Sequence, residues 1–202
     1  MDTARPYADV IPGPRGRLLA NLAQLEGPVT VRALARFADI SPQSALGYVN
    51  ALDDAGIVFV ERAGQALMIS LNREHLGAES IMTLATIRER LVDRLRAELN
   101  DWYGLAGAWL FGSTARGDGG TDSDVDLLLV ADLATEDPGW VKATTRLRER
   151  ARLWTGNEIQ LVEHTRASFT ELVESANPLV AAIRTEGISL TQGSRVLLRS
   201  PA

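Results

Sequence analysis

The chain has 202 residues, 46% of them hydrophobic, and carries a formal net charge of −5. This length and composition suit a soluble globular protein with one large domain or two small ones, and the absence of cysteine excludes disulfide bonds and thiolate metal sites. No apolar run is long enough to span a bilayer and the first residues lack the layout of a signal peptide, so we expect a cytoplasmic protein that does not bind membranes.

The first part of the chain predicts an irregular arm followed by two helices. Residues 1–14 contain three prolines and are expected to form a flexible arm. Leucines then recur at helical spacing over residues 15–25, up to a helix-breaking Gly-Pro pair. A second apolar stripe begins after Thr30 and predicts a helix over residues 31–37.

A third helix and a hairpin follow. Ser41 and Pro42 supply an N-cap and a first-turn proline for the helix. Residues 57–61 and 66–70 are apolar stretches on either side of a glycine-containing turn, which predicts a β-hairpin. Three helices and a hairpin in this order resemble a winged helix-turn-helix domain, and the resemblance covers residues 15–76.

The resemblance to a winged helix-turn-helix domain, if it extends to function, implies DNA recognition by the third helix and the wing. The positions that would contact DNA are Gln43, Ser44, Gly47, Tyr48 and Arg62. The charge distribution opposes this interpretation, because residues 1–75 hold seven arginines against eight acidic residues, and residues 41–55 hold no basic residue. A dimerisation or partner-docking module is therefore the alternative.

A long helix is predicted between the two halves of the chain. Residues 80–101 carry an apolar stripe on one side and charged residues elsewhere. We therefore assign residues 77–102 to a connecting helix, whose stripe packs into a core or forms the seam of a homodimer, and residues 103–202 to a second domain.

The second domain opens with an apolar strand that ends in a polar bend. Residues 108–111 are apolar and precede Gly112, which allows a sharp turn and the close approach of a ligand. Ser113 then begins a short helix, so that its hydroxyl and the free backbone N–H groups are directed to one place. This arrangement suits a phosphate.

Two acids follow at a spacing that favours metal binding. Asp124 and Asp126 are separated by one residue in a strand, which places both carboxylates on one face, with Val125 and Leu127 on the other. Two carboxylates on one face repel each other unless a divalent cation lies between them. A phosphate site next to a Mg²⁺ site implies a nucleoside triphosphate.

Gly112-Ser113, ten intervening residues and Asp124-x-Asp126 resemble the signature of the DNA polymerase β-type nucleotidyltransferases, in particular the minimal ones. The resemblance implies that Asp124 and Asp126 hold two Mg²⁺ ions and that Gly112 and Ser113 hold the β- and γ-phosphates of the NTP. Arg116 either reaches a phosphate or forms a surface ion pair with a nearby acid, Asp118 or Asp122.

The remaining pattern predicts an α/β (α+β) nucleotidyltransferase core. A helix is expected from Asp137-Pro138 to Gly156, followed by an alternating strand over residues 158–163. A capping box that begins at Ser168 and an Asn177-Pro178 pair each start a further helix.

A third carboxylate is usual in this family on the later strand, but Gln160 occupies the equivalent setting here. Gln160 is neutral and cannot act as a base. Glu158 lies on the same face one pleat earlier and is the candidate replacement, whereas Glu163 faces the other way. If Glu158 does not complete the site, one Mg²⁺ and a nucleotide still bind while transfer is slow or absent.

Two functional hypotheses follow from these patterns. In the first, the protein is a Mg²⁺-dependent nucleotidyltransferase that moves NMP, AMP first among the candidates, from an NTP to a hydroxyl of a protein, RNA or small molecule. The resemblance to minimal nucleotidyltransferases extends this to an antitoxin that modifies a partner toxin. In the second, the protein is a DNA-binding transcriptional regulator whose degenerate transferase domain senses nucleotide.

Overall fold

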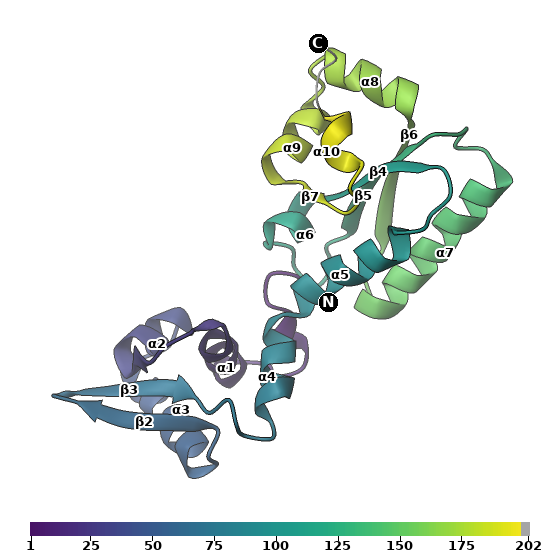
Figure 1. The fold of residues 1–202 in the computed structure, drawn as a ribbon. Coiled ribbons are helices and arrows are strands. Elements are labelled where there is room, and N and C mark those ends of the chain that lie inside the picture. The colour runs from purple at the N-terminus through teal and green to yellow at the C-terminus, as the bar shows by residue number, and fades with distance from the viewer. Residues whose placement is uncertain (199–202) are drawn as a thin grey trace. The chain divides into compact units, whose positions relative to one another are not determined.

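The computed structural model describes residues 1–198, which form two compact units (Figure 1). The N-terminal unit is Arg5–Ile87. The C-terminal unit consists of Met1–Ala4 together with the chain from Arg88 onward. The chain therefore leaves the C-terminal unit after its fourth residue and returns to it at Arg88, whereas we had expected the domain boundaries near residues 15, 77 and 103.

The N-terminal unit combines helices with a small antiparallel sheet in the order β1-β3-β2. Its elements are η1 (Pro6–Asp9), α1 (Pro14–Gln24), β1 (Val29–Thr30), α2 (Val31–Phe37), α3 (Pro42–Asp54), β2 (Val58–Ala63), β3 (Ala66–Leu71) and α4 (Ala78–Ala85). The predicted helices and hairpin are confirmed. Ser41 caps α3 by accepting a hydrogen bond from the Ser44 N–H. The core of this unit includes Leu18, Leu34 and Val49.

The prediction that residues 1–14 form a flexible arm is wrong. Pro6 begins η1 and Pro14 begins α1, because the fixed φ of proline suits the first position of a helix. Ile11 is held by a hydrogen bond from its N–H to the Tyr7 carbonyl at 2.8 Å. In Met1–Ala4, the side chains of residues 2 and 3 are buried in the C-terminal unit.

The C-terminal unit contains a four-stranded mixed sheet in the order β6-β5-β4-β7. β5 pairs parallel with β6, and β4 pairs antiparallel with β5 and β7. The elements are α5 (Ile87–Leu99), β4 (Leu105–Phe111), α6 (Gly112–Arg116), β5 (Val125–Ala131), α7 (Pro138–Thr155), β6 (Ile159–Thr165), α8 (Arg166–Glu174), α9 (Pro178–Glu186), β7 (Ile188–Ser189) and α10 (Ser194–Leu197). This is the mixed α/β class that we predicted.

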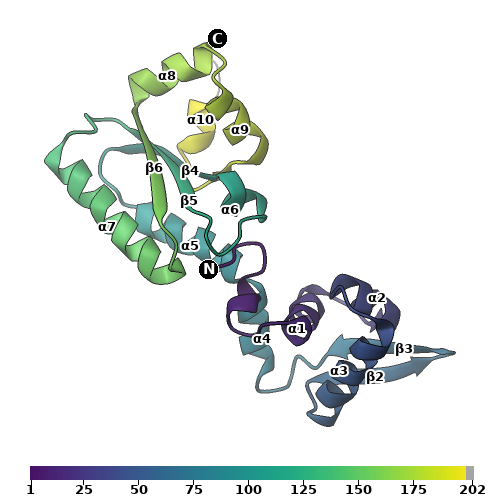
Figure 2. The same cartoon turned by 180° about the vertical axis from the view of Figure 1, so that it is seen from behind.

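Helices cover both faces of this sheet, α5 and α7 on one side and α8 to α10 on the other (Figure 2). Alternate residues of β5 enter the two cores. Leu127 and Leu129 pack with α5 and α7, and Leu128 and Val130 pack on the side of α8 and α9. Asp126 precedes Leu128 on the same face by the period of two, so one end of that face carries an acid instead of a core residue.

The single helix predicted over residues 80–101 is two helices, and the prediction is corrected at Thr86. There the backbone leaves the helical region, at φ −115° and ψ 23°. The Met82 carbonyl accepts both the Thr86 N–H at 3.1 Å and the Thr86 hydroxyl at 2.9 Å, and a hydroxyl bond of this kind often bends a helix. The apolar stripe is therefore divided, with Ile81 in one core and Leu91 in the other.

Two local details of the C-terminal unit also differ from the prediction. The N-cap of α8 is Thr165, which accepts from the Ser168 N–H, so Ser168 itself lies inside the helix. The short strand β7 and the helix α10 were not predicted. Among the helices of residues 1–198, none has both the length and the apolar composition needed to cross a membrane.

Candidate active site

Gly112 brings the bend after β4 directly against the acid pair. Its φ of +68° lies in the left-handed region, which glycine adopts without strain. A Cβ atom at this position would overlap Oδ2 of Asp126 and lie 3.1 Å from its Cγ. Both the backbone conformation and the close approach therefore require glycine, and the structure places the bend and Asp126 side by side.

We expect Gly112→Ala to lower both stability and activity. The substitution forces alanine into a left-handed conformation and pushes it against the Asp126 carboxylate, at a cost of roughly 1–3 kcal/mol. Thermal melting and nucleotidyl transfer should both show the loss. Gly120→Ala is the matched control, because a Cβ at Gly120 meets no atom within 4 Å. Equal behaviour of the two variants would contradict this role of Gly112.

Asp124 directly precedes β5, Asp126 is the second residue of the strand, and the charge of Asp124 acts on Asp126. Burial is the first cause that raises the pKa of Asp126 above its ordinary value of 3.8, and the negative charge of Asp124 is the second. The positive charge of Arg116 acts in the opposite direction. Two acids and one arginine thus share a small, partly buried region, which is the arrangement that a cation would stabilise.

The backbone of Asp124 is fixed from two sides. Thr114, which is fully buried in α6, donates a hydrogen bond from its hydroxyl to the Asp124 carbonyl at 3.3 Å. The next residue, Val125, donates its N–H to the carbonyl of Glu158 at 2.9 Å. α6 and the start of β6 therefore set the position from which the Asp124 side chain extends.

Ser113 lies at the start of α6, with its hydroxyl close to Gly119. A Cβ on Gly119 would lie 2.8 Å from Oγ of Ser113. The Ser113 carbonyl accepts the N–H groups of Gly117 and Asp118 at 2.9 and 3.1 Å, which closes the turn after α6. Within residues 1–198 the hydroxyl makes no hydrogen bond, so it is available to an incoming phosphate oxygen.

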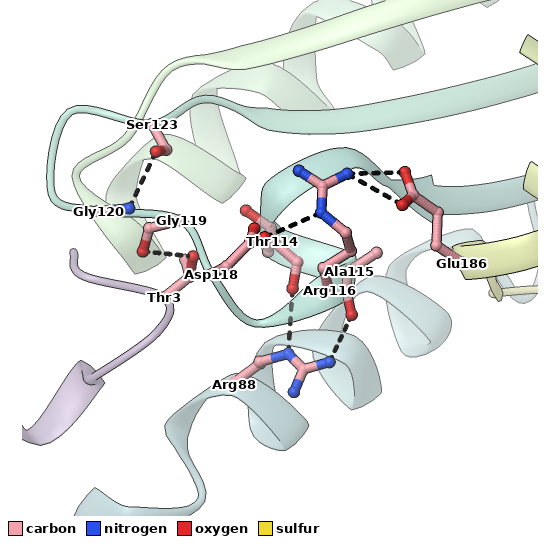
Figure 3. A network of polar contacts seen from close by, with 10 residues as sticks. All are labelled: Thr3, Arg88, Thr114, Ala115, Arg116, Asp118, Gly119, Gly120, Ser123 and Glu186. Atoms are coloured by element: carbon pink, nitrogen blue, oxygen red, sulfur yellow. Dashed lines mark hydrogen bonds and ion pairs between the residues drawn. The ribbon is translucent and has the colours of Figure 1, made fainter. Parts of the chain in front are cut away.

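Arg116, at the end of α6, is held by two carboxylates (Figure 3). Its Nε donates to Asp118 at 3.0 Å, and its Nη1 donates to the two oxygens of Glu186 at 2.9 and 3.0 Å. These bonds, that to Asp118 first, raise the pKa of Arg116. Of the two ion pairs considered from the sequence, the pair with Asp118 is present and that with Asp122 is not. Glu186, 70 residues away, was not predicted.

The structure does not bring Glu158 into a group with Asp124 and Asp126. Gln160 lies beside Asp126 in the parallel register, as the alternation predicts. The Glu158 carboxylate instead pairs with Arg152 at 3.0 Å, with both side chains about two-thirds exposed (66% and 65%). Across residues 1–198 no group of three or more acidic or histidine side chains is arranged to hold a metal ion.

Glu163 occupies the opposite face of β6, as expected. Its carboxylate accepts a hydrogen bond from Nε1 of Trp140 at 2.6 Å and pairs with Arg148 at 3.0 Å. Both partners belong to α7. Glu163 therefore fastens α7 to the sheet and takes no part in the acid pair.

Three side chains outside the motif hold α6 and the loop that joins it to β5. Asn157, which is 4% exposed, donates to the carbonyls of Thr121 and Ser123 at 3.1 and 2.7 Å. Thr3 donates to the Gly119 carbonyl at 3.0 Å, and Arg88 donates from Nε to the carbonyl of Thr114 at 3.0 Å, as Figure 3 shows. No sequence motif marks these residues as functional.

The positions considered for DNA contact lie in the N-terminal unit. Gln43, Ser44 and Gly47 are exposed on α3, and Arg62 is exposed near the end of β2. Tyr48 is partly buried and packs against the core of this unit, so it is less accessible than the prediction requires.

One arginine of the N-terminal unit, Arg17 of α1, has a structural contact. Arg17 donates from Nε to the Ala38 carbonyl at 2.6 Å. This bond joins α1 to the end of α2, and because the carbonyl is uncharged, Arg17 keeps its positive charge.

A cavity of about 750 Å³ opens elsewhere in the C-terminal unit. It lies between the end of α5, the start of β4 and the segment around β7, and its lining includes Arg96, Trp102 and Arg195. None of the predicted nucleotide or metal residues lines it, so it is separate from the acid pair.

The comparisons with known proteins bear on the C-terminal unit. Residues 92–185 match the family model for a nucleotidyltransferase domain. This segment includes the bend and both acids, and the match supports the transferase class for the unit. A comparison with curated proteins finds none that matches the chain.

Solved structures show limited similarity. The crystal structure of a toxin-antitoxin with AMP-PNP is 21% identical, with a TM-score of 0.36, over 55% of this chain and 80% of that one. RV1404 from Mycobacterium tuberculosis is 17% identical, with a TM-score of 0.35, over 73% and 80%. Human N-acetylserotonin methyltransferase in complex with SAM is 13% identical, with a TM-score of 0.30, over 83% and 44%. TM-scores this low do not establish a common fold.

Proposed function

We propose that the C-terminal unit transfers a nucleoside monophosphate, AMP first among the candidates, from an NTP to a hydroxyl group with the help of Mg²⁺. One observation carries the proposal above the others: Gly112 places the Gly112-Ser113 bend in contact with Asp126, so a phosphate site and an acidic site adjoin. The match of residues 92–185 to a nucleotidyltransferase domain supports the same chemistry.

The acid pair fits one Mg²⁺ ion. Carboxylate oxygens are hard donors of the kind this ion prefers, and the partial burial and mutual repulsion of Asp124 and Asp126 are relieved by a positive charge. The residue beside Asp126 on β6 is Gln160, and the Glu158 carboxylate pairs with Arg152. The acid pair therefore has no third carboxylate beside it, which favours one bound ion over the two that the resemblance implies. When bound, the ion would neutralise charge on the nucleotide phosphates.

The side chains of the unit would then position the nucleotide. The Ser113 hydroxyl donates to a phosphate oxygen, and Arg116 supplies a positive charge from the same short helix. The acceptor hydroxyl attacks the α-phosphorus and pyrophosphate leaves. Gln160 cannot take the proton of the acceptor, and so we expect slow transfer unless the acceptor or a partner supplies a base.

The direct test is transfer of label. The protein would be incubated with Mg²⁺, a cell lysate and each NTP labelled at the α-phosphate in turn. We expect one NTP to label a protein, RNA or small molecule, and the label to disappear in the Asp124→Asn/Asp126→Asn double variant. Labelling of a small helical toxin would identify the antitoxin-like role. If the wild-type protein transfers no label from any NTP, transferase activity is ruled out.

The second candidate is a nucleotide-sensing regulator that binds DNA through the N-terminal unit. Gln160 in place of an acid and the exposed residues of α3 favour it. It predicts a nucleotide-induced thermal shift without transfer, together with salt-dependent DNA retention. Retention should weaken in Gln43→Ala and Arg62→Ala, and retention that is unaffected by both would remove the proposed contact surface.

A further inference from the structure

The position of Glu186 at the end of α9 calls for an explanation. It is the last residue of the helix, where the negative end of the helix dipole disfavours a carboxylate. Its side chain is only 22% exposed, and both of its oxygens accept hydrogen bonds from Arg116. The local preference of the helix therefore does not account for this acid, whereas its contact with Arg116 does.

Arg116 is oriented with part of its guanidinium group unused. Nε is bonded to Asp118 and Nη1 to Glu186, and Nη2 has no hydrogen-bond partner within residues 1–198. Arg116 follows Ser113 by three positions in α6, a spacing that places two helical residues on the same side. The free Nη2 group is therefore on the helix that carries the proposed phosphate-binding hydroxyl.

Of the two carboxylates, Glu186 is the better anchor. The Asp118 side chain is 60% exposed and belongs to the turn after α6, where solvent weakens its attraction for Arg116. Glu186 is more enclosed and belongs to a packed helix whose Val180 and Ile183 lie in the core. The bond to Glu186 therefore ties Arg116 to the rigid part of the unit.

We propose that Glu186 is a positioning residue that holds the Arg116 guanidinium so that Nη2 meets a phosphate oxygen of the bound NTP. The inference rests on the proposed function. A free arginine side chain samples many rotamers, and fixing two of its nitrogens in advance reduces the entropy lost when the third binds. The cost is a negative charge near the phosphates, which Arg116 offsets.

The test is the affinity for ATP in which a methylene group replaces the α,β-bridging oxygen, measured by titration in the presence of Mg²⁺. We expect Glu186→Gln to weaken binding about tenfold, the order of effect seen when a group that orients a ligand-binding side chain is lost. Glu174→Gln is the matched control, because Glu174 is also the last residue of a helix, is exposed and does not contact Arg116. The Glu174→Gln variant should bind the analogue with the affinity of the wild type.

A double-mutant cycle separates positioning from a general effect on the fold. If Glu186 acts through Arg116, then Glu186→Gln should weaken binding in the wild-type background and have no further effect in Arg116→Ala. Arg116→Lys keeps the charge but lacks Nη2, so it should reproduce the loss and tests the same contact if Glu186→Gln unfolds. Thermal melting of each variant identifies such unfolding.

The outcomes distinguish a failure of the positioning role of Glu186 from a failure of the proposed nucleotide site. Unchanged or tighter binding in folded Glu186→Gln, or full affinity in Arg116→Lys, overturns the positioning role and leaves the nucleotide site intact. Additive losses in the cycle also overturn it. A wild-type protein that does not bind the analogue, and equally fails with ATP, GTP, CTP and UTP, overturns the proposed function together with this inference.

Discussion

Asp126→Asn is expected to abolish nucleotidyl transfer and, at the same time, to make the ligand-free protein more stable. Loss of one carboxylate from the pair removes the charge that would hold Mg²⁺, and we expect transfer to fall roughly a thousandfold. The gain in stability has a separate cause. Burial and the charge of Asp124 raise the pKa of Asp126, so its ionised form is less favourable in the folded state than in the unfolded state.

The pH dependence follows from the sign of this pKa shift. Below the ordinary value of 3.8, Asp126 is protonated in both the folded and unfolded states and contributes no penalty. As the pH rises through the raised folded pKa, ionisation reduces the stability of the wild type but not of Asp126→Asn. The Tm difference should therefore be present at neutral pH and vanish in acid.

The size of this stability gain is small. Because Asp126 is partly solvated, we expect less than about 1 kcal/mol, or less than about 4 °C in Tm. Added salt should reduce it by screening Asp124. Asp122→Asn serves as the control, since Asp122 is an exposed acid in the loop that precedes β5. A decrease in Tm for Asp126→Asn at neutral pH would show that the acid pair is not under electrostatic strain.

Substitution of Asn157 is the second prediction with a large effect. Asn157→Ala removes the buried amide that donates to the carbonyls of Thr121 and Ser123, and leaves both carbonyls without this partner. We expect a loss of about 3 kcal/mol in the free energy of unfolding. Because Ser123 directly precedes Asp124, transfer should also fall, about tenfold or more, in protein that remains folded.

Asn157→Asp provides the sharper variant. It has nearly the same shape, but it replaces the amide donor by a carboxylate oxygen that faces the carbonyls of Met1, Thr121 and Ser123. The Met1 ammonium, which donates to the other side-chain oxygen, offsets part of this repulsion, so we expect a loss similar to that of alanine. Asn100→Ala, at an exposed position of the same unit, should behave like the wild type in denaturant unfolding and in transfer. Wild-type stability in both Asn157 variants would contradict the structural role assigned to this side chain.

The elements with strong local signals are those that the sequence predicts correctly. Asp137 caps α7, and Gly156 ends the helix in the left-handed conformation. Asn177 and Pro178 begin α9 in the same local way. Each signal lies within a few residues of the helix end that it specifies, so no knowledge of the tertiary structure is needed.

In the candidate site, too, residues that are close in sequence could be predicted and partners that are distant in sequence could not. The bend and the acid pair lie within fifteen residues of one another, and the resemblance of this spacing to the nucleotidyltransferase signature predicts that they share a site. Glu186 and Arg88 contact α6 from 70 and 26 residues away, and no periodicity identifies such partners. The ion pair of Glu158 with Arg152 is likewise not readable from the strand pattern, because Arg152 belongs to the neighbouring helix α7.

The return of the chain to the C-terminal unit at Arg88 has a consequence for how the protein folds. Thr3 and Gly119 are bonded across 116 positions, and Met1 and Asn157 across 156. Such distant pairings are slow to form, because the intervening chain must first be confined. During synthesis, all of residues 5–87 are made before the segments that Met1 and Thr3 contact, at Asn157 and Gly119. The site that we propose for nucleotide would thus be among the last parts of the protein to become ordered.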